Sequence, residues 1–166
     1  MNREKFLQLK KNVIDWANER NLLASTTTEK QKLKLISEVG ELSDAILKNN
    51  LDEIKDAIGD CIVVLILYFD IDRKSIDNYV FFAEEIDEKM FYHDALMNIL
   101  YCIFILDKEE KNIYNTKQNV LLNILINLIA IGNKYELSIV DCLNYSYNQI
   151  KNRRGQIVNG TFIKDN

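Results

Sequence analysis

Proline is absent from all 166 residues of this chain. Because proline breaks helices more strongly than any other residue, its absence favours an all-α protein. Apolar residues also recur at helical spacing along most of the sequence. Thr28, with Gln31 three residues later, fits a capping box, and Asp52 is a candidate N-cap for the helix after it. The pattern predicts helices over residues 3–20, about 28–46, 53–69, 75–89, 92–106, 117–132 and 137–152.

The predicted helix over residues 53–69 is apolar nearly all round, which is typical of a central, buried helix. The connection before it, over residues 48–51, is short, so the helices on either side should form an antiparallel hairpin. Glu41 and Asp60 lie almost equally far along the chain from Asn50 in that connection. At a rise of about 1.5 Å per residue, both should lie about 14 Å from the turn and therefore face each other.

Carboxylates gather on the facing sides of this hairpin. Glu38 and Glu41 share a helix face at i, i+3. Asp56 and Asp60 share one at i, i+4, and Glu53 extends the same stripe. A buried carboxylate cluster repels itself unless protons or cations neutralise it. Oxygen ligands without a nearby His or Cys favour a hard cation, so the pattern predicts Mg²⁺ or Mn²⁺.

The alternative is an exposed helix surface with ordinary acidic side chains, and for Asp44 and Glu53 we favour that interpretation. For Asp60 it fails, because the apolar residues around it leave no polar face on that helix. Asp60 is therefore predicted to be a metal ligand or a member of a carboxylate site.

Composition argues against several classes of protein. The net charge of −4 lacks the basic excess of a dedicated nucleic-acid binder. Widely spaced cysteines and a single histidine argue against a zinc site, and isolated cysteines in apolar runs are typical of core thiols in a reducing compartment. We therefore expect no nucleic acid as partner and a cytoplasmic location. The residues concerned are Cys61, Cys102, Cys142 and His93.

Membrane association is not expected either. The charged N-terminal segment shows no secretory signal. The longest apolar stretches, residues 61–69 and 120–131, are shorter than the ~20 residues that a membrane span requires.

The carboxylates lie in motifs that carry a family resemblance. KLISEVGELSDAI, followed by EIKDAIGDCIVVLI, resembles the MazG-like all-α nucleoside triphosphate pyrophosphohydrolases, which carry E-x-x-E on one helix and E-x-x-D on the next. The resemblance places Glu38 and Glu41 in the first pair and Asp60 at the end of the second. The second glutamate would fall at position 57, which is Ala57 here. Asp56, one residue earlier, is the natural substitute because it also neighbours position 60 on a helix.

The end of the chain adds to the resemblance. YNQIKNRRGQIVNGTF resembles the tail of short MazG-like proteins common in phages and Gram-positive bacteria. The resemblance covers residues 1–70 and about 133–164 and implies a single domain over 1–166, a helical bundle built from antiparallel hairpins. Residues 71–132 are extra relative to the short forms. They are either a decayed copy of the motif hairpin, with Asn123 in the place of Asp60, or two unrelated amphipathic helices.

The resemblance implies hydrolysis of a nucleoside triphosphate to the monophosphate and pyrophosphate, with Mg²⁺ (or Mn²⁺) as cofactor. It assigns Glu38, Glu41 and Asp60 to catalysis, and these three with Asp56 to the metal. It also implies a homodimer, although one chain would suffice if its second half takes the partner's place. Ala57 keeps another function open, that of a catalytically weak regulator that binds nucleotides or a helical partner.

Cations are needed to meet the phosphates of such a substrate. The candidates are Lys34, Lys151, Arg153 and Arg154, whose alternative is ordinary solvated surface charge. Trp16, the single tryptophan, either stacks on the base or belongs to the core. The sequence does not name the preferred base or sugar, nor does it separate canonical nucleotides from alarmones.

Overall fold

The computed structural model describes residues 2–85, 92–106, 116–159 and 161–165. This part of the chain is helical apart from one small two-stranded hairpin, so the predicted all-α class is confirmed. The helices are α1 (Arg3–Glu19), α2 (Leu22–Ser25), α3 (Thr28–Leu47), α4 (Leu51–Ile71), α5 (Asp77–Ala83), α6 (Tyr92–Ile105), α7 (Lys117–Lys134) and α8 (Ile139–Ile150). The strands are β1 (Gly155–Val158) and β2 (Thr161–Lys164), paired antiparallel.

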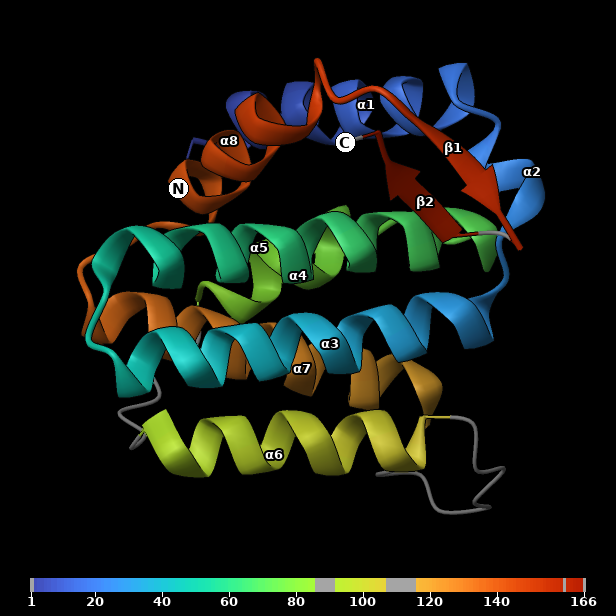
Figure 1. Ribbon diagram of the computed structural model, residues 1–166. Coiled ribbons are helices and arrows are strands. Elements are labelled where there is room, and N and C mark those ends of the chain that lie inside the picture. Colours follow the sequence, from blue (N-terminus) through green and yellow to red (C-terminus); the bar gives the residue numbers. More distant parts are fainter. Residues whose placement is uncertain (1, 86–91, 107–115, 160, 166) are drawn as a thin grey trace.

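The antiparallel pair α3 and α4 forms the middle of the molecule (Figure 1). α1 and α8 cover one side of α4, and α6 and α7 lie together on the other side of the pair. The β hairpin follows α8 and lies beside α2, which β2 contacts (Figure 1). Within the described residues, no single helix has both the length and the apolar character needed to cross a membrane.

α4 is the core helix that its composition predicts. Every residue from Cys61 to Phe69 is buried, on all sides of the helix. A helix with no exposed face needs neighbours all round. α1, α3, α7 and α8 contact it within a single chain.

The turn between α3 and α4 shows why the sequence Lys48-Asn49-Asn50 ends one helix and starts the next. Asn49 adopts the left-handed conformation at φ 50°, which asparagine tolerates better than most residues. The N–H of Asn50 then donates to the Ala45 carbonyl and that of Asn49 to the Ile46 carbonyl, a Schellman motif. Asn50 also caps α4 by accepting from the Glu53 N–H at 3.4 Å. The predicted cap at Asp52 is therefore wrong, because Asp52 already lies within the helix.

Two further predictions need correction, and two elements were missed. Thr27, not Thr28, is the N-cap of α3, accepting from the Lys30 N–H at 3.3 Å. The helix predicted over 75–89 is shorter, since α5 ends at Ala83, and its predicted last residues lie outside the described part. The hairpin and the short α2 were not predicted, although an Asn-Gly dipeptide at 159–160 between two alternating segments is a strong hairpin signal.

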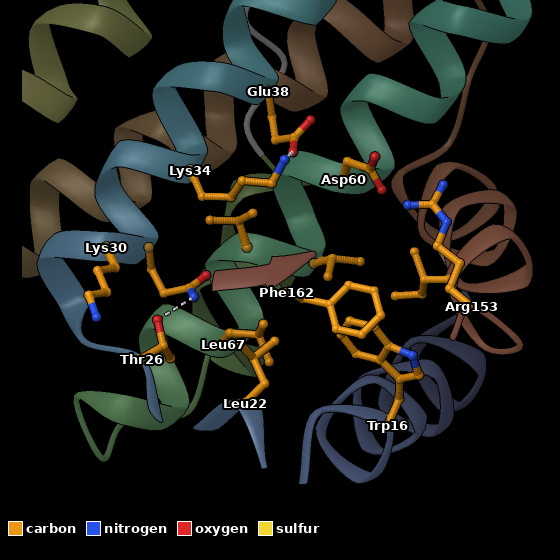
Figure 2. Close-up of a pocket in the computed structure, with 14 residues that line it drawn as sticks. Trp16, Leu22, Thr26, Lys30, Lys34, Glu38, Asp60, Leu67, Arg153 and Phe162 are labelled. Carbon is orange, nitrogen blue, oxygen red and sulfur yellow. Dashed lines mark hydrogen bonds and ion pairs between the residues drawn. The ribbon is translucent and has the colours of Figure 1, made fainter. Parts of the chain in front are cut away.

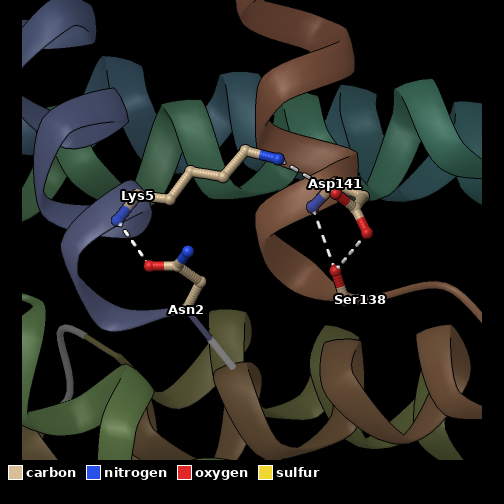
Figure 3. A network of polar contacts seen from close by, with 4 residues as sticks. All are labelled: Asn2, Lys5, Ser138 and Asp141. Atoms are coloured by element: carbon tan, nitrogen blue, oxygen red, sulfur yellow. Dashed lines mark hydrogen bonds and ion pairs between the residues drawn. The ribbon is translucent and has the colours of Figure 1, made fainter.

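The N-termini of α1 and α8 lie side by side and are joined by an ion pair (Figure 3). Asn2 caps α1 through the Lys5 N–H at 3.0 Å, and Ser138 caps α8 through the Asp141 N–H at 3.1 Å. The Lys5 ammonium meets the Asp141 carboxylate at 3.3 Å. This exposed pair contributes little energy, but it lies where α8 begins its run along α4.

Candidate functional site

A pocket of about 180 Å³ opens between the N-terminal helices, the α3–α4 pair, the end of α8 and the hairpin (Figure 2). One end is polar and the other is apolar and aromatic. Its lining consists of Trp16, Leu22, Thr26, Lys30, Gln31, Lys34, Glu38, Asp60, Val63, Val64, Leu67, Ile150, Arg153 and Phe162.

The polar end combines carboxylates with cations. Glu38 is buried on α3, and its carboxylate forms an ion pair with the ammonium of Lys34, one turn earlier. Asp60 on α4 faces this pair from the opposite wall, and Arg153 reaches toward Asp60 from the end of α8 (Figure 2). Two carboxylates, Glu38 and Asp60, therefore lie between two cations, Lys34 and Arg153, at this end of the pocket.

A second hollow, a groove of about 170 Å³, also borders Asp60. Asp60 lines both hollows and so connects them. Of the predicted metal ligands, Glu41 and Asp56 line this groove with Asp60, whereas Glu38 lines the pocket with Asp60. The groove lining consists of Glu41, Asp44, Lys48, Glu53, Asp56, Ala57 and Asp60.

Burial and neighbouring acids disfavour the charged form of three of these carboxylates, Glu38, Asp56 and Asp60. Burial raises the pKa of Asp60 to about 7, and the nearby charges of Asp56 and Glu38 add to the effect. Burial also raises the pKa of Asp56, against which Arg153 and Ser146 act. The pKa of Glu38 is likewise raised by burial, although the bond to Lys34 acts in the opposite direction. The geometry accounts for the polar residue in an apolar run: Asp60 is tolerated because it faces two hollows, beside cations.

α8 approaches these carboxylates unusually closely. A Cβ at Gly59 would lie 2.2 Å from both the Cys142 carbonyl oxygen and the Ser146 Oγ, so only glycine fits there. The Ser146 hydroxyl is fully buried and donates to the main-chain oxygen of Asp56 at 2.9 Å. It also lies 3.4 Å from the Asp56 Oδ1.

Among the cations predicted from the sequence, Lys34 and Arg153 line the pocket. Lys151 and Arg154 are exposed and lie outside its lining; the Lys151 ammonium instead donates to the Asn148 Oδ1 at 2.7 Å. Lys30 lines the pocket and was not predicted. Its ammonium donates to the Asn159 carbonyl oxygen and thereby fastens the hairpin to α3.

The aromatic end is built by residues far apart in sequence. Trp16 is 7% exposed, and its ring meets the edge of the Phe162 ring at a centroid distance of 5.7 Å (Figure 2). The Trp16 Nε1–H finds no hydrogen-bond partner among the described residues. On another wall the buried Gln31 side chain donates to the Thr26 Oγ1 at 3.0 Å. Phe162, Gln31 and Thr26 were not predicted; only the hairpin signal at 159–160 could have brought Phe162 here.

Comparison with known protein families adds to this geometry. Residues 26–90 match the family model of the MazG nucleotide pyrophosphohydrolase domain. This segment is MazG-like. The resemblance seen in the sequence is therefore confirmed over these residues, which extend past position 70 into the region expected to be extra.

One similar protein is described as an uncharacterized 18.2 kDa protein in the rep-hol intergenic region of Haemophilus phage HP1 (strain HP1c1). It is 50% identical to this chain over 60 residues, which make up 36% of this chain and 37% of the relative. The match thus spans little more than a third of either protein. No solved structure matches the chain.

The MazG-like segment supplies only part of the pocket. It carries the four carboxylates of the predicted metal site, together with Lys34. The rest of the lining comes from outside it, from α1, from α2, from the end of α8 and from the hairpin. Those residues are Trp16, Leu22, Ile150, Arg153 and Phe162.

Cysteine chemistry has no place in the site of the MazG-like segment. All three cysteines are buried as free thiols. Burial raises the pKa of Cys61 far above its usual value and that of Cys142 to about 12, and it also raises the pKa of Cys102. A neutral thiol is a poor nucleophile, so these side chains act as small core residues.

Proposed function

We propose that this protein is a Mg²⁺-dependent nucleotide pyrophosphohydrolase that converts a (d)NTP and water to the (d)NMP and pyrophosphate. The observation that carries the proposal is the pocket itself. It joins an aromatic end, suited to a nucleobase, to an end where the carboxylates of a MazG-like segment meet cations.

The donor chemistry fits a hard divalent cation. Among the described residues, no three His, Cys, Asp or Glu side chains come close enough to form a ready metal cluster. The candidates nevertheless offer only oxygen atoms, and burial together with neighbouring acids raises the pKa of three of them. A bound cation would stabilise the charged form of these carboxylates, and Mg²⁺ prefers carboxylate oxygens. Glu38, Glu41, Asp56 and Asp60 would hold it.

A bound Mg²⁺ would neutralise triphosphate charge and lower the pKa of a water molecule. The chain's own residues do the rest. In the proposed reaction a carboxylate among Glu38, Glu41 and Asp60 orients the attacking water and takes its proton. The water oxygen forms a bond to the α-phosphorus. The bond from that phosphorus to the oxygen bridging it to the β-phosphorus breaks, and pyrophosphate leaves with the electron pair.

Lys34 and Arg153 are the proposed phosphate ligands, because both lie at the polar end of the pocket. Lys30 is a third cation within the lining. Trp16 and Phe162 would together offer the base one aromatic wall, which accepts any base because every base has a π face. We place this reaction in the cytoplasm, where free thiols stay reduced.

A panel of canonical and modified (d)NTPs tests the proposal directly. The expected result is Mg²⁺-dependent release of NMP and pyrophosphate in equal amounts, abolished by EDTA and by Asp60→Asn. Release of inorganic phosphate instead of pyrophosphate would contradict the assigned bond cleavage.

A second function remains a candidate because of Ala57, which puts a methyl group where the family motif has a carboxylate. In that case the protein binds nucleotides, or a helical partner, and acts as a regulator. Nucleotide binding by calorimetry without pyrophosphate release, at saturating Mg²⁺, would favour this function over hydrolysis.

A further inference from the structure

We infer that Ser146, on α8 and outside the MazG-like segment, is a positioning residue that aims the Asp56 carboxylate into the metal site. The inference rests on the proposed function and deepens it. It assigns to α8 a role in building the site, in addition to covering the core.

A buried hydrogen bond joins Ser146 to Asp56. Ser146 is fully buried, so its hydroxyl has no water to bind and must be satisfied within the protein. It donates to the Asp56 carbonyl oxygen at 2.9 Å and lies 3.4 Å from the Asp56 Oδ1. One hydroxyl thus bonds the main chain of Asp56 and lies beside the carboxylate of the same residue, which places it where it can limit the rotation of that side chain.

α4 has room for this hydroxyl at Gly59. Gly59 lacks the side chain that would occupy the position of the Ser146 Oγ, 2.2 Å from an ideal Cβ. Any larger residue at 59 would separate the two helices and withdraw the hydroxyl from Asp56. Gly59 directly precedes Asp60, so the close approach occurs where the carboxylates lie.

Asp56 stands one residue before the position where the family motif has its carboxylate. The family motif has its carboxylate at position 57, where this chain has Ala57. Asp56 has a shorter side chain and a different direction from the helix axis, so a fixed rotamer matters more for it than for a longer glutamate. Ser146 supplies that restraint from a neighbouring helix. In metal sites generally, removing a hydrogen-bond partner of a metal ligand lowers metal affinity or activity by roughly 10- to 100-fold.

The competing explanation is that Ser146 is only a small residue that lets α8 pack on α4. Ser146→Ala separates the two, because alanine keeps the size and removes the hydroxyl. Mn²⁺ affinity of the nucleotide-free protein is the main readout, and kcat and KM are measured alongside. We expect the Mn²⁺ Kd to rise about 10-fold or more, kcat to fall by a similar factor, and KM to change less than about threefold.

Cys142→Ala is the matched control. Cys142 lies one turn earlier on α8 and is equally buried, and its main-chain carbonyl, not its side chain, is what approaches Gly59. It should lower the melting temperature without changing the Mn²⁺ Kd. A double-mutant cycle with Asp56→Ala completes the test. If Ser146 acts through Asp56, adding Ser146→Ala to Asp56→Ala should change the Mn²⁺ Kd less than about twofold.

The outcomes separate the two proposals. Wild-type protein that binds Mn²⁺, with Ser146→Ala equal to it, would overturn the role of Ser146 and leave the proposed function standing. Equal losses from Ser146→Ala with and without Asp56 would also overturn it, because the hydroxyl would then act through another group. Wild-type protein that binds no Mn²⁺ at millimolar concentration would refute the metal site, and the role of Ser146 with it.

Discussion

The Lys34 ammonium is paired with the Glu38 carboxylate, a side chain that is only 4% exposed. Both residues have proposed roles that require other partners, the metal for Glu38 and phosphate for Lys34. In the metal-free protein the Lys34 ammonium therefore neutralises the Glu38 carboxylate. A metal ion must displace this ammonium before it can bind Glu38. Because the side chain of Lys34 is 49% exposed, it can leave Glu38 without crossing the core.

Lys34→Met tests this relationship. It leaves the buried carboxylate of Glu38 without its cation, which should cost the metal-free protein roughly 1–3 kcal/mol of stability. Mn²⁺ should then raise the melting temperature more than it does in the wild type, because no ammonium competes for Glu38. Thermal unfolding with and without Mn²⁺ measures both effects.

Lys11→Met is the matched control for that variant. Lys11 pairs at 2.5 Å with Asp15, also at i, i+4 along a helix, but both side chains are exposed and neither lines the pocket or the groove. Its loss should change neither stability nor the Mn²⁺ response noticeably. Identical Mn²⁺ shifts in the two variants would argue that Lys34 does not compete with a cation.

Asp60 should make the stability of the metal-free protein depend on pH. Its pKa is raised to about 7 in the folded state, from near 4 when unfolded. The folded state thus holds this proton more tightly, so the stabilisation is present below about pH 4 and is lost as pH rises through 7. Between pH 4 and pH 8 the free energy of unfolding of the wild type should fall by about 2–4 kcal/mol, and this fall should be absent in Asp60→Asn. Urea unfolding in EDTA measures both.

Saturating Mg²⁺ should offset the same loss in the wild type by stabilising the charged form of the carboxylate, and it should not do so in Asp60→Asn. Parallel pH profiles for the wild type and Asp60→Asn in EDTA would show that Asp60 titrates normally. An unchanged metal-induced melting shift in Asp60→Asn would remove it from the metal site.

Gly59 and Gly40 allow a paired test of the contact between α4 and α8. A Cβ at Gly59 would lie 2.2 Å from the Cys142 carbonyl oxygen, which belongs to a helix backbone and cannot turn aside. Gly59→Ala should therefore cost about 1–3 kcal/mol or more by overpacking. A Cβ at Gly40, on α3, would meet nothing within 4 Å, so Gly40→Ala should stabilise by about 0.5–1 kcal/mol. Urea unfolding of both variants checks the opposite signs.

Asp56→Ala tests whether this residue replaces the glutamate missing at position 57. As a lost metal ligand it should reduce kcat/KM at least ~10²-fold, equivalent to ~2.7 kcal/mol of transition-state stabilisation. As a solvated surface residue it should cost under about threefold. Ala57→Glu should restore activity in the Asp56→Ala background and add little to the wild type. A wild-type rate for Asp56→Ala at saturating Mg²⁺ would show that Glu38, Glu41 and Asp60 suffice.

The sequence predicted those parts of the molecule that depend on local order. The periodicity of α4 and the short turn after Lys48 were enough to place Glu41 and Asp60 on facing helices. The far side of the site was beyond reach of such reasoning. Ser146 and Phe162 lie about ninety residues or more from Asp56, and their positions follow from how α8 and the hairpin return to α4, which no local pattern specifies.

The starts of α3 and α4 were predicted wrongly for a related reason. Thr27 and Thr28 are equally good caps by residue type, and so are Asn50 and Asp52. The choice between each pair depends on backbone conformation, which is extended at Thr27 and at Asn50. Gly59 shows the same limit in the core, since its sequence context does not reveal that another helix occupies the space of its missing side chain.

The last prediction concerns assembly. We expect a homodimer, and the exposed apolar face of α6 is where a second chain would pack. Four of its large side chains lie at i, i+3, i+4 and i+7 and are 40–65% exposed. Soluble proteins rarely leave such a stripe uncovered unless it contacts a partner. The residues are Met97, Leu100, Tyr101 and Phe104.

A monomer is the competing outcome. It is supported by the burial of α4 on all sides from Cys61 to Phe69 within one chain. Light scattering of the wild type at micromolar concentration separates the two. A dimer mass that falls to the monomer mass in Tyr101→Lys/Phe104→Lys, with pyrophosphohydrolase activity retained, would locate the interface on α6. A monomer mass for the wild type would refute the dimer and indicate that α6 and α7 take the place of a partner's helices.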